Sequence, residues 1–431
     1  MTTNDDFSVR LGDWLREDSA GRVPGHLDEV LLRTAGVRQR RWWSSPGRWL
    51  PMNVTATRLW AVRPTSLRTV LVLGLVALII AALVAVLVGS RRPLPPPFGL
   101  ARNGALVSSA NGDLFTVDPK TGTGTPLIAG PTFDFGPAFS RDGTRVAFAR
   151  GAPTPCGEPD CGLILVVANA DGTGLREITP GEPGLDWLDW SPDGTRIAFL
   201  SYVAGVSGHV LNIVNVDGTG LMTLDVGHPV NQLSWLPPDG AEILFRGEHL
   251  RESDPPPGIF AVRPDGTGFR PISTRPALDP NDFNDVAVSP DGSLVAYRAV
   301  APDRPFAIRI LDLRSRVERV LPTPSDSGMG GPLFSPDGRS VVYLRWYPDS
   351  STQLVVAPVD GSSLGIAIGP HGPLGSDGPT INNYGFSPDG RSVFANYDAE
   401  KVARLLPVDG SPGEVIARGE LALVSYQRLA P

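Results

Sequence analysis

Cysteine is almost absent from this chain: among 431 residues only Cys156 and Cys161 occur, within the stretch PCGEPDCG. A structural zinc site needs four ligands, and no histidine lies near this pair, so we expect no zinc site there. Two alternatives remain open, a disulfide or two free thiols. A disulfide would require an oxidising compartment. Because it would close so short a loop, it would shape that loop more than it would stabilise the fold.

Lysine is nearly as scarce, since only Lys120 and Lys401 stand among the 38 basic residues. We interpret this as a bias toward arginine that is typical of GC-rich bacteria, without functional meaning. Residues 1–69 carry 11 basic and 7 acidic residues, whereas residues 90–431 carry 27 basic and 38 acidic residues, a net charge of −11. An acidic domain argues against nucleic acid as a partner, because phosphate binding needs a basic surface.

Motifs for catalysis and cofactor binding are missing as well. The sequence contains no EF-hand, P-loop or Rossmann pattern, and its five histidines show no metal-ligand spacing, so we expect neither a metal nor another cofactor. The stretch GSSLG at Gly361–Gly365 matches the G-x-S-x-G pattern of hydrolases, which requires a strand–turn–helix context with His and Asp partners. Ser363 instead occupies a repeated hairpin turn, so we expect no enzymatic activity.

Charged residues are absent from Thr69–Gly89, an apolar run of 21 residues. As a helix this run is about 30 Å long, which matches the hydrocarbon thickness of a bilayer and predicts a transmembrane helix over residues 67–90. The alternatives are a buried core helix and a cleaved signal peptide. The preceding segment is too long for the charged region of a signal peptide, which favours an uncleaved anchor.

The arginine distribution predicts the orientation of this anchor. Arginines cluster before the apolar run at positions 33, 38, 40, 41, 48, 58, 63 and 68, whereas Arg91, Arg92 and Arg102 follow it. The positive-inside rule then places residues 1–66 in the cytoplasm and the larger domain outside, in a single-pass membrane protein. The proline-rich PLPPPFG lies in a predicted stalk over residues 91–103, because such segments are extended and semi-rigid.

A repeated motif runs through the remainder of the chain. Its copies are FSRDGTRVAF, WSPDGTRIAF, LPPDGAEILF, VSPDGSLVAY, FSPDGRSVVY and FSPDGRSVFA, with the aspartate at positions 142, 193, 239, 291, 337 and 389. The Pro-Asp-Gly core favours a tight turn, and the residues after it alternate between apolar and polar, which predicts a β-hairpin, the A–B hairpin. A second series of Gly-rich hairpins, such as VDGTGL, interleaves with the first and supplies strands C and D. Four-stranded units at this spacing are typical of propeller blades.

The turns also allow the blades to be counted. Six A–B turns stand against seven C–D hairpins, and the surplus hairpin is the first, preceded by ALVSS without an A strand. The C-terminal ELALVSYQRL fits the missing A strand. We therefore predict an all-β, seven-bladed β-propeller over residues 104–431, closed by the C-terminal strand, with six blades as the alternative.

These motifs resemble the repeat of the TolB-like β-propellers, which are relatives of WD-repeat propellers, over residues 104–431. The resemblance implies the propeller fold. It does not imply the role of TolB, because TolB is a soluble periplasmic protein with its own N-terminal domain and usually six blades. This chain has a predicted anchor and seven C–D hairpins instead.

The loops predict where a ligand binds. The A–B and C–D turns share one face and are uniform, whereas the B–C and D–A loops on the other face vary, and variable loops on a rigid scaffold usually carry binding. Polar residues near the start of the channel-lining strands form a candidate binding ring: Asp186, Gln232, Asn284, Asp285, Asn382 and Asn383. The alternative is that these side chains only bond loop backbones or channel water.

The N-terminal segment contains two short amphipathic stretches that predict helices, followed by RQRRWW near the membrane. Inner helices, one span and an outer domain resemble the layout of membrane-anchored anti-sigma factors, but the usual His-x3-Cys-x2-Cys zinc motif is absent. We expect a binding or sensing propeller with a protein or small ligand outside and a cytoplasmic protein partner for residues 1–66. The alternatives are an extracytoplasmic propeller hydrolase or lyase and a Tol-type envelope scaffold. The sequence identifies no ligand and no oligomeric state.

Overall fold

The computed structural model describes the outer domain. The described residues are 98–151, 162–202, 208–247, 257–273, 286–301, 304–322, 324, 327–373, 381–398, 400–419 and 422–430, all within the compact unit Leu87–Pro431. The predicted cytoplasmic segment 1–66, the predicted span 67–90, the stalk before Phe98, and both cysteines lie outside these residues. Within the described part, no helix has the length and apolar character needed to cross a membrane.

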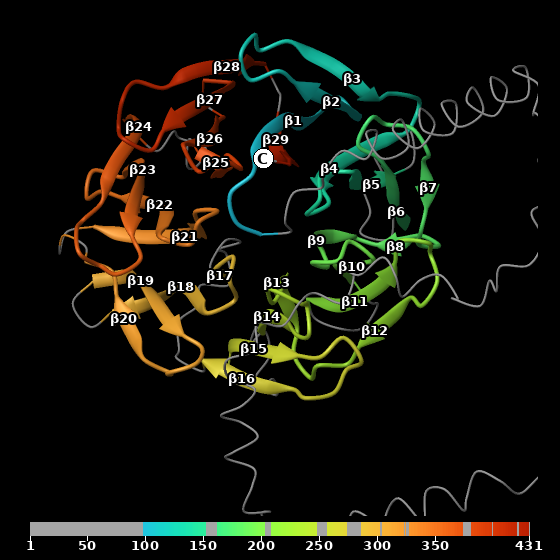
Figure 1. Cartoon of the computed structure of the whole chain (residues 1–431), viewed down its shortest axis with the longest axis horizontal. Helices are drawn as coiled ribbons and strands as arrows, with labels where there is room; N and C mark the ends of the chain where they lie inside the picture. Colours follow the sequence, from blue (N-terminus) through green and yellow to red (C-terminus); the bar gives the residue numbers. More distant parts are fainter. Residues whose placement is uncertain are drawn as a thin grey trace, which may run out of the picture. The chain divides into compact units, whose positions relative to one another are not determined.

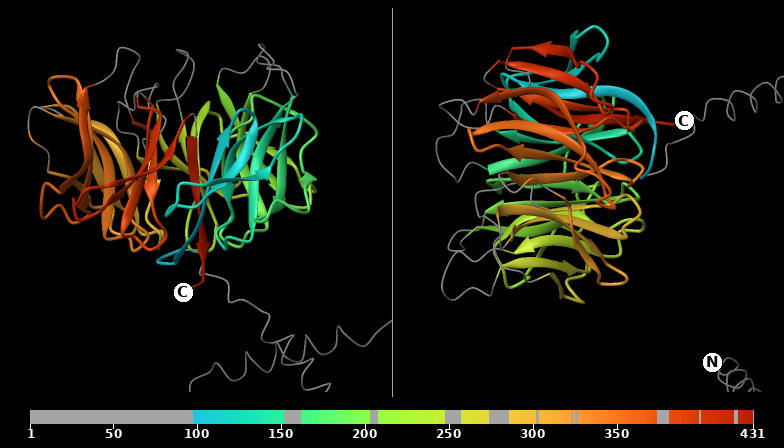
Figure 2. Two further views of the ribbon diagram at one scale, coloured as in Figure 1. Left: turned by 90° about the horizontal axis from the view of Figure 1, so that it is seen from above. Right: turned by 90° about the vertical axis from the view of Figure 1, so that its left-hand side faces the viewer.

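The described chain is all-β, as predicted, and its antiparallel sheets stand around a central channel (Figure 1). Seen from the side, the sheets form one layer of blades around that channel (Figure 2). This arrangement is a β-propeller.

Each blade is built from strands that are consecutive in sequence, with one exception at the chain ends. The sheet at the ends contains β29 (Ala422–Leu429), β1 (Arg102–Ala110), β2 (Asp113–Val117) and β3 (Gly124–Ile128). The next contains β4 (Phe133–Phe139), β5 (Arg145–Gly151), β6 (Gly162–Asn169) and β7 (Arg176–Glu177), with the short β8 (Glu182–Pro183) also on β6.

An eight-stranded sheet follows, in which two four-stranded units meet through the single pair His209↔Val230. Its first unit is β9 (Asp186–Trp190), β10 (Arg196–Tyr202), β11 (His209–Asn215) and β12 (Met222–Leu224). Its second unit is β13 (Val230–Trp235), β14 (Ile243–Gly247), β15 (Gly258–Val262) and β16 (Arg270–Ser273).

Three four-stranded sheets complete the described ring. The first contains β17 (Val286–Val288), β18 (Leu294–Ala301), β19 (Arg304–Asp312) and β20 (Glu318–Val320). The second contains β21 (Gly328–Phe334), β22 (Ser340–Trp346), β23 (Ser351–Pro358) and β24 (Ile366–Pro373). The third contains β25 (Ile381–Phe386), β26 (Ser392–Tyr397), β27 (Val402–Pro407) and β28 (Glu414–Arg418).

The hydrophobic core lies between neighbouring blades. The middle strands are apolar on both faces, so that every residue of β14 and β15 is buried. One cluster joins the sheet of β21–β24 to that of β25–β28 through Val342, Leu354, Ile368, Tyr384, Val393 and Leu406. Each blade therefore depends on its two neighbours for the burial of its apolar side chains.

The repeated Ser-x-Asp-Gly motif forms the turn between the first two strands of a blade. In five copies the serine Oγ donates a hydrogen bond of 2.6 Å to the aspartate Oδ1. In the same copies the serine oxygen also accepts the amide hydrogen of the residue five positions on. The glycine has a positive φ, for example 70° at Gly338, which other residues rarely adopt. The motif is a turn structure, as the sequence indicated, and Ser363 likewise lies in the connection between β23 and β24.

The two chain ends meet in one blade. β29 pairs with β1 from Arg102↔Leu429 to Ser109↔Ala422, with two shifts of register. Around this pair, the Arg102 Nε donates to the Ala430 carbonyl at 2.6 Å, and the Gln427 side chain donates to the Gly143 carbonyl at 2.8 Å. The predicted closure by the C-terminal strand is confirmed at the level of this pairing.

The turn serine should contribute measurably to stability. Ser335 is 4% exposed and makes bonds of 2.6 Å to Asp337 and 2.9 Å from the Ser340 amide. We expect Ser335→Ala to lower the free energy of unfolding of the full-length protein by about 1–2 kcal/mol, because the partly buried Ser340 amide loses its acceptor. Urea denaturation followed by tryptophan fluorescence measures this change.

Ser363→Ala provides the matched control. Its exposed hydroxyl accepts only a long hydrogen bond of 3.3 Å, from the Gly365 amide. We expect its effect to stay within about 0.5 kcal/mol. Equal effects of the two substitutions would contradict the role given to Ser335.

Candidate functional site

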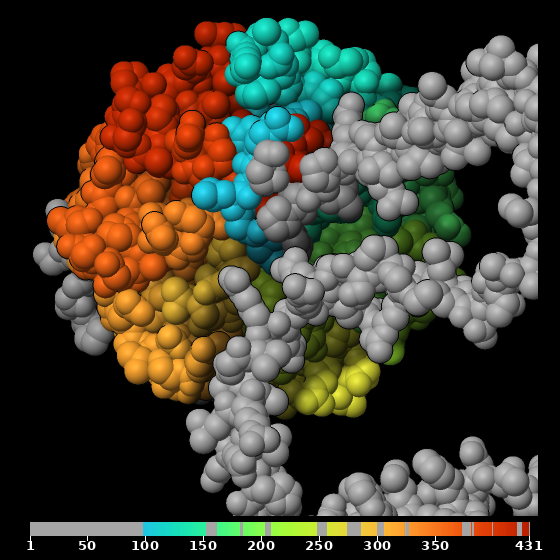
Figure 3. All heavy atoms as spheres, in the orientation of Figure 1, coloured from blue at the N-terminus to red at the C-terminus, as the bar shows by residue number. Residues whose placement is uncertain are grey.

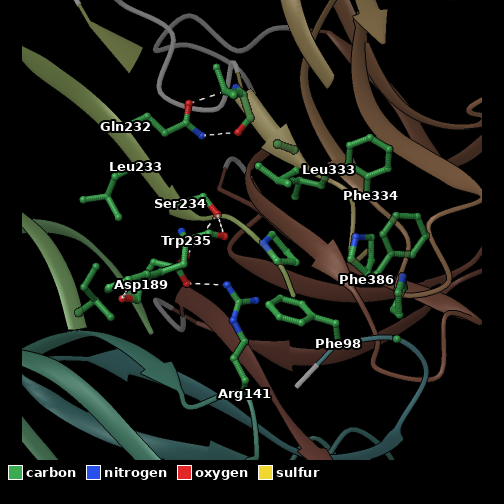
Figure 4. A pocket seen from close by; sticks show the side chains of 18 of the residues that line it. Phe98, Arg141, Asp189, Gln232, Leu233, Ser234, Trp235, Leu333, Phe334 and Phe386 are labelled. Carbon is green, nitrogen blue, oxygen red and sulfur yellow. Dashed lines mark hydrogen bonds and ion pairs between the residues drawn. The ribbon is translucent and has the colours of Figure 1, made fainter. Parts of the chain in front are cut away.

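A cavity of ≈ 430 Å³ lies at the mouth of the central channel, beside the A–B turns. Its walls come from the ends of β9, β13, β17, β21 and β25 (Figure 4). Phe98 and Gly99, which lead into β1, and Arg428 of β29 complete the lining. In Figure 3 the first described residues, in blue, lie over the centre of the ring.

Most of the residues that line the cavity are apolar, because most copies of the repeat place an apolar residue and, two positions later, a proline at the end of the channel-lining strand. The apolar side chains are Leu233, Trp235, Val286, Val288, Leu333, Phe334 and Phe386, with Pro237, Pro290 and Pro336 from the turns. Trp187 adds an indole whose Nε1 donates to the Leu233 carbonyl at 2.9 Å. Its φ of 33° is unusual for a residue with a Cβ, so this bond fixes a strained position.

Asp189 is the acidic residue among the described lining residues, and both of its carboxylate oxygens accept hydrogen bonds. Its Oδ1 accepts the Arg141 Nη2 at 2.6 Å, and its Oδ2 accepts the Trp235 amide at 3.0 Å and the Ser234 hydroxyl at 3.2 Å. Arg141 belongs to the β4–β5 turn and Trp235 to β13, on either side of β9. One carboxylate therefore ties three successive blades together at the channel mouth.

Two arginines, Arg141 and Arg428, are among the described residues that line the cavity. The Arg428 Nη2 donates to the Gly99 carbonyl at 2.7 Å, and the Arg141 guanidinium lies 5.1 Å from the centre of the Phe98 ring. Burial first, and then repulsion from Arg141, lower the pKa of Arg428 to about 10. The Nε of Arg141 is buried and has no hydrogen-bond partner within the described residues.

Among the described members of the predicted polar ring, Gln232 lines this cavity. Gln232 is 5% exposed, and its side-chain amide bonds the Val286 backbone twice, donating at 2.8 Å and accepting at 3.1 Å. It therefore connects β13 to β17. Bonding to backbone groups is the alternative to ligand binding that the sequence left open for the polar ring.

Asp186 and Asn383 are not among the residues that line the cavity. The Asp186 side chain is 58% exposed, accepts the Trp187 amide at 2.7 Å and lies 3.8 Å from the His209 Nε2. Asn383 is partly buried in β25. Asn284 and Asp285 lie outside the described residues, as does the Asn382 side chain.

The sequence reasoning missed Arg141, Asp189 and Arg428, which form the charged part of the cavity. One signal was present: FSRDG carries Arg141 where most copies of the motif have proline. Asp189 and Arg428 have no such signal, because they reach the same cavity from strands of different blades.

A second hollow of ≈ 350 Å³ lies on the loop-bearing face, where the sequence predicts binding. Its lining is Arg298, Phe306, Ser327, Gly328, Trp346, Tyr347 and Pro348. The Arg298 guanidinium lies 4.2 Å from the Phe306 ring centre and 5.8 Å from that of Trp346. It thus occupies the space between these rings.

A Ser-His pair on the same face bears on the enzyme alternative. The Ser351 Oγ lies 2.7 Å from the His371 Nε2, and Asp349 accepts a hydrogen bond from this same hydroxyl. In a catalytic triad the acid orients the histidine instead. Among the described residues, no group of three His, Cys, Asp or Glu could hold a metal ion.

Asp189 should matter more to stability than the exposed Asp186. We expect Asp189→Asn to lower the free energy of unfolding by about 1–3 kcal/mol, because the Arg141 pair loses its charge and the Trp235 amide loses a charged acceptor. Thermal unfolding of the full-length protein measures the loss. Asp186→Asn is the control, expected within about 0.5 kcal/mol, and a larger effect of the control would contradict the assignment.

Comparison with known proteins gives structural similarities alone. No family model and no curated protein matches the chain. An oligogalacturonate lyase in complex with manganese is similar over 56% of this chain and 70% of its own, with 16% identity and a TM-score of 0.45. TolB from Acinetobacter baumannii is similar over 65% of each chain, with 18% identity and a TM-score of 0.41. A prolyl endopeptidase is similar over 76% of this chain and 49% of its own, with 14% identity and a TM-score of 0.49.

Proposed function

We propose that this protein is a single-pass membrane protein whose extracytoplasmic β-propeller binds a protein or small ligand without catalysing a reaction. The observation that carries the proposal is the cavity at the channel mouth. There the uniform repeat is interrupted by Arg141, and the two chain ends contribute Phe98, Gly99 and Arg428. The repeated turns thus surround one cavity whose lining includes residues that differ from the repeat.

The proposal favours binding over catalysis because of how the polar groups are used. The oxygens of Asp189 accept bonds from Arg141 and from the β13 backbone, so this carboxylate is not poised to take a substrate proton. The Gln232 amide is likewise bonded to the backbone of β17. Arg141 and Arg428 are the positively charged residues of the described lining.

The proposed propeller has seven blades. The strand orders support this count, because the channel-lining strands β29, β4, β9, β13, β17, β21 and β25 each begin a four-stranded unit. An experimentally determined density map with six blades would contradict it.

The proposed anchor is the apolar run Thr69–Gly89, with residues 1–66 in the cytoplasm. Cys156 and Cys161 are the only cysteines, so a membrane-impermeant maleimide tests this topology directly. We expect labelling on intact cells, after a reductant if the pair is oxidised. Labelling only after lysis would contradict it. A cysteine-free variant carrying Ser8→Cys is the control and should label only after lysis.

Sensing is the finer part of the proposal: ligand binding outside would be passed through the stalk to a cytoplasmic protein partner of residues 1–66. What supports it is the layout of the chain, with short amphipathic stretches inside and an outer domain whose lead-in, Phe98–Gly99, lines the cavity.

Photo-crosslinking in cells tests binding at the cavity. A photo-reactive phenylalanine analogue replaces Phe98 at the cavity or, as the control, Phe269, which is 45% exposed beyond the β15–β16 turn. We expect a discrete adduct from the Phe98 position only, in gels and by mass spectrometry. Identical adducts from both positions, or an adduct from Phe269 alone, would count against the cavity as the binding site.

A further inference from the structure

We propose that the face of the propeller that carries the A–B and C–D turns docks on the outer surface of the lipid bilayer through an arc of exposed apolar side chains. This inference rests on the proposed membrane anchor and adds an interaction surface to it. The surface, called the apolar arc below, takes one side chain from each of five consecutive blades: Leu175, Leu221, Phe269, Val317 and Leu364.

The members of the apolar arc occupy the same place in the repeat. Each lies at the end of a C–D turn, just before the outermost strand of its blade, which is β7, β12, β16, β20 or β24 (Figure 1). Because a propeller repeats its blades by rotation about the channel, equivalent residues lie at about the same height along the channel axis. The arc therefore follows the rim of the ring in roughly one plane, and a flat partner can contact all of its members together.

These side chains are exposed although they are large and apolar. Their exposed fractions range from 39% at Leu221 to 60% at Val317. The adjoining strands add further exposed apolar side chains, namely Met222, Val320 and Ile366. Single exposed apolar residues are common on protein surfaces, but their recurrence at one place in five blades indicates a contact surface.

The fold itself does not require an apolar residue at this place. In the two blades at the chain ends, the residue before the outermost strand is Thr123 or Gly413. The C–D turn is held by its aspartate instead: Asp171 accepts the Thr173 amide at 3.0 Å and the Thr173 hydroxyl at 2.6 Å. A role outside the propeller therefore explains the apolar side chains better than a role within it.

The length of the connecting chain selects the bilayer as the partner. Nine residues, Ser90–Phe98, follow Gly89, the last residue of the apolar run. A chain of this length spans at most about 30 Å. Phe98 lines the cavity at the channel mouth beside the A–B turns, so the chain enters the propeller near the centre of the turn-bearing face.

The opposite face cannot reach the bilayer with so short a connection. A path from the channel mouth around the rim covers the three strand spacings of a blade, about 14 Å, and then its height, about 23 Å for the seven residues of β22. This path exceeds the reach of the connection, so the proposed anchor holds the turn-bearing face toward the bilayer. A face-to-face pair with a second copy in the same membrane conflicts with this orientation, because both copies would turn this face toward the lipid.

The chemistry of the arc suits the bilayer interface. Leucine, valine and phenylalanine side chains are buried about 5–10 Å deep at the boundary between headgroups and acyl chains when an apolar face lies on a membrane. Leu175 and Phe269 are each followed directly by an arginine and preceded by the aspartate of their turn. A long arginine side chain can keep its charge at headgroup depth while its apolar neighbour enters the interface. Because charges of both signs flank the arc, apolar burial and not net charge drives the docking.

Fluorescence in lipid nanodiscs tests the contact. The cysteine-free, full-length protein carries one cysteine labelled with the fluorophore NBD, through Phe269→Cys or Leu364→Cys in the arc or Tyr202→Cys as the control. Tyr202 is also exposed, by 42%, but it ends β10 on the opposite face. In phosphatidylcholine nanodiscs we expect a blue shift of the emission at both arc positions and a loss of fluorescence when the lipid carries a nitroxide on its acyl chain. The Tyr202 position should show neither.

Serine substitutions show whether the arc itself makes the contact. With the label at Leu364, the other four members of the arc are replaced by serine, and we expect the nitroxide quenching to fall. Phe133→Ser combined with Tyr202→Ser, two exposed aromatic residues of the opposite face, is the matched control and should leave the quenching unchanged. Phe269→Ser alone replaces the fourfold variant if circular dichroism shows that the latter fails to fold. Added salt should not weaken the quenching, because salt screens charge interactions and not apolar burial.

The outcomes separate this inference from the proposed anchor. Flotation of the full-length protein with phosphatidylcholine vesicles after a carbonate wash measures the anchor, and its failure removes the proposed membrane protein itself. With the anchor intact, an absence of quenching at both arc positions, or equal quenching at Tyr202, would overturn the docking and leave the anchor standing. A blue shift without nitroxide quenching indicates that protein, such as a second copy, covers the arc, and it also overturns the inference.

Discussion

The antiparallel pairing of β29 with β1 is the contact on which the rest of the ring depends. Apolar side chains are buried between neighbouring blades, so a ring that failed to close would leave two inner faces exposed to water. The pairing places Tyr426 against Leu106 and sets that blade between the clusters on its two sides. It joins the first and last parts of the domain at the cost of a very long loop, which the burial on both sides offsets.

Closure also creates the candidate site. Arg428 and Gly99 are 329 positions apart in sequence and are joined by a hydrogen bond of 2.7 Å. Arg141 approaches them from the β4–β5 turn, and Asp189 from β9 fixes that arginine. The cavity therefore forms only in the closed ring. Only there does Arg141, which replaces the usual proline of the motif, line a cavity together with Gly99 and Arg428.

The sequence predicted local structures such as the turns, but it did not predict which residues from different blades meet at the cavity. Asp337 and Gly338 indicate a turn through their own conformational preferences, and the spacing of such turns predicted the blades and the strand that closes them. Gln232 was predicted from its position in the repeat, but its bond partner, the backbone of β17, lies in another blade and could not be predicted. Asp189 and Arg428 were missed because nothing in their neighbouring residues shows which blades meet at the channel mouth.

The position of β1 within its blade has a mechanical consequence. The predicted stalk precedes β1, which is paired on both sides, by β29 and by β2, and is not an edge strand. A pull directed along β1 would load the hydrogen bonds of both ladders together in shear, whereas an edge strand could be peeled away bond by bond. A pull on the chain that enters β1 is therefore resisted by the hydrogen bonds of two ladders in one blade.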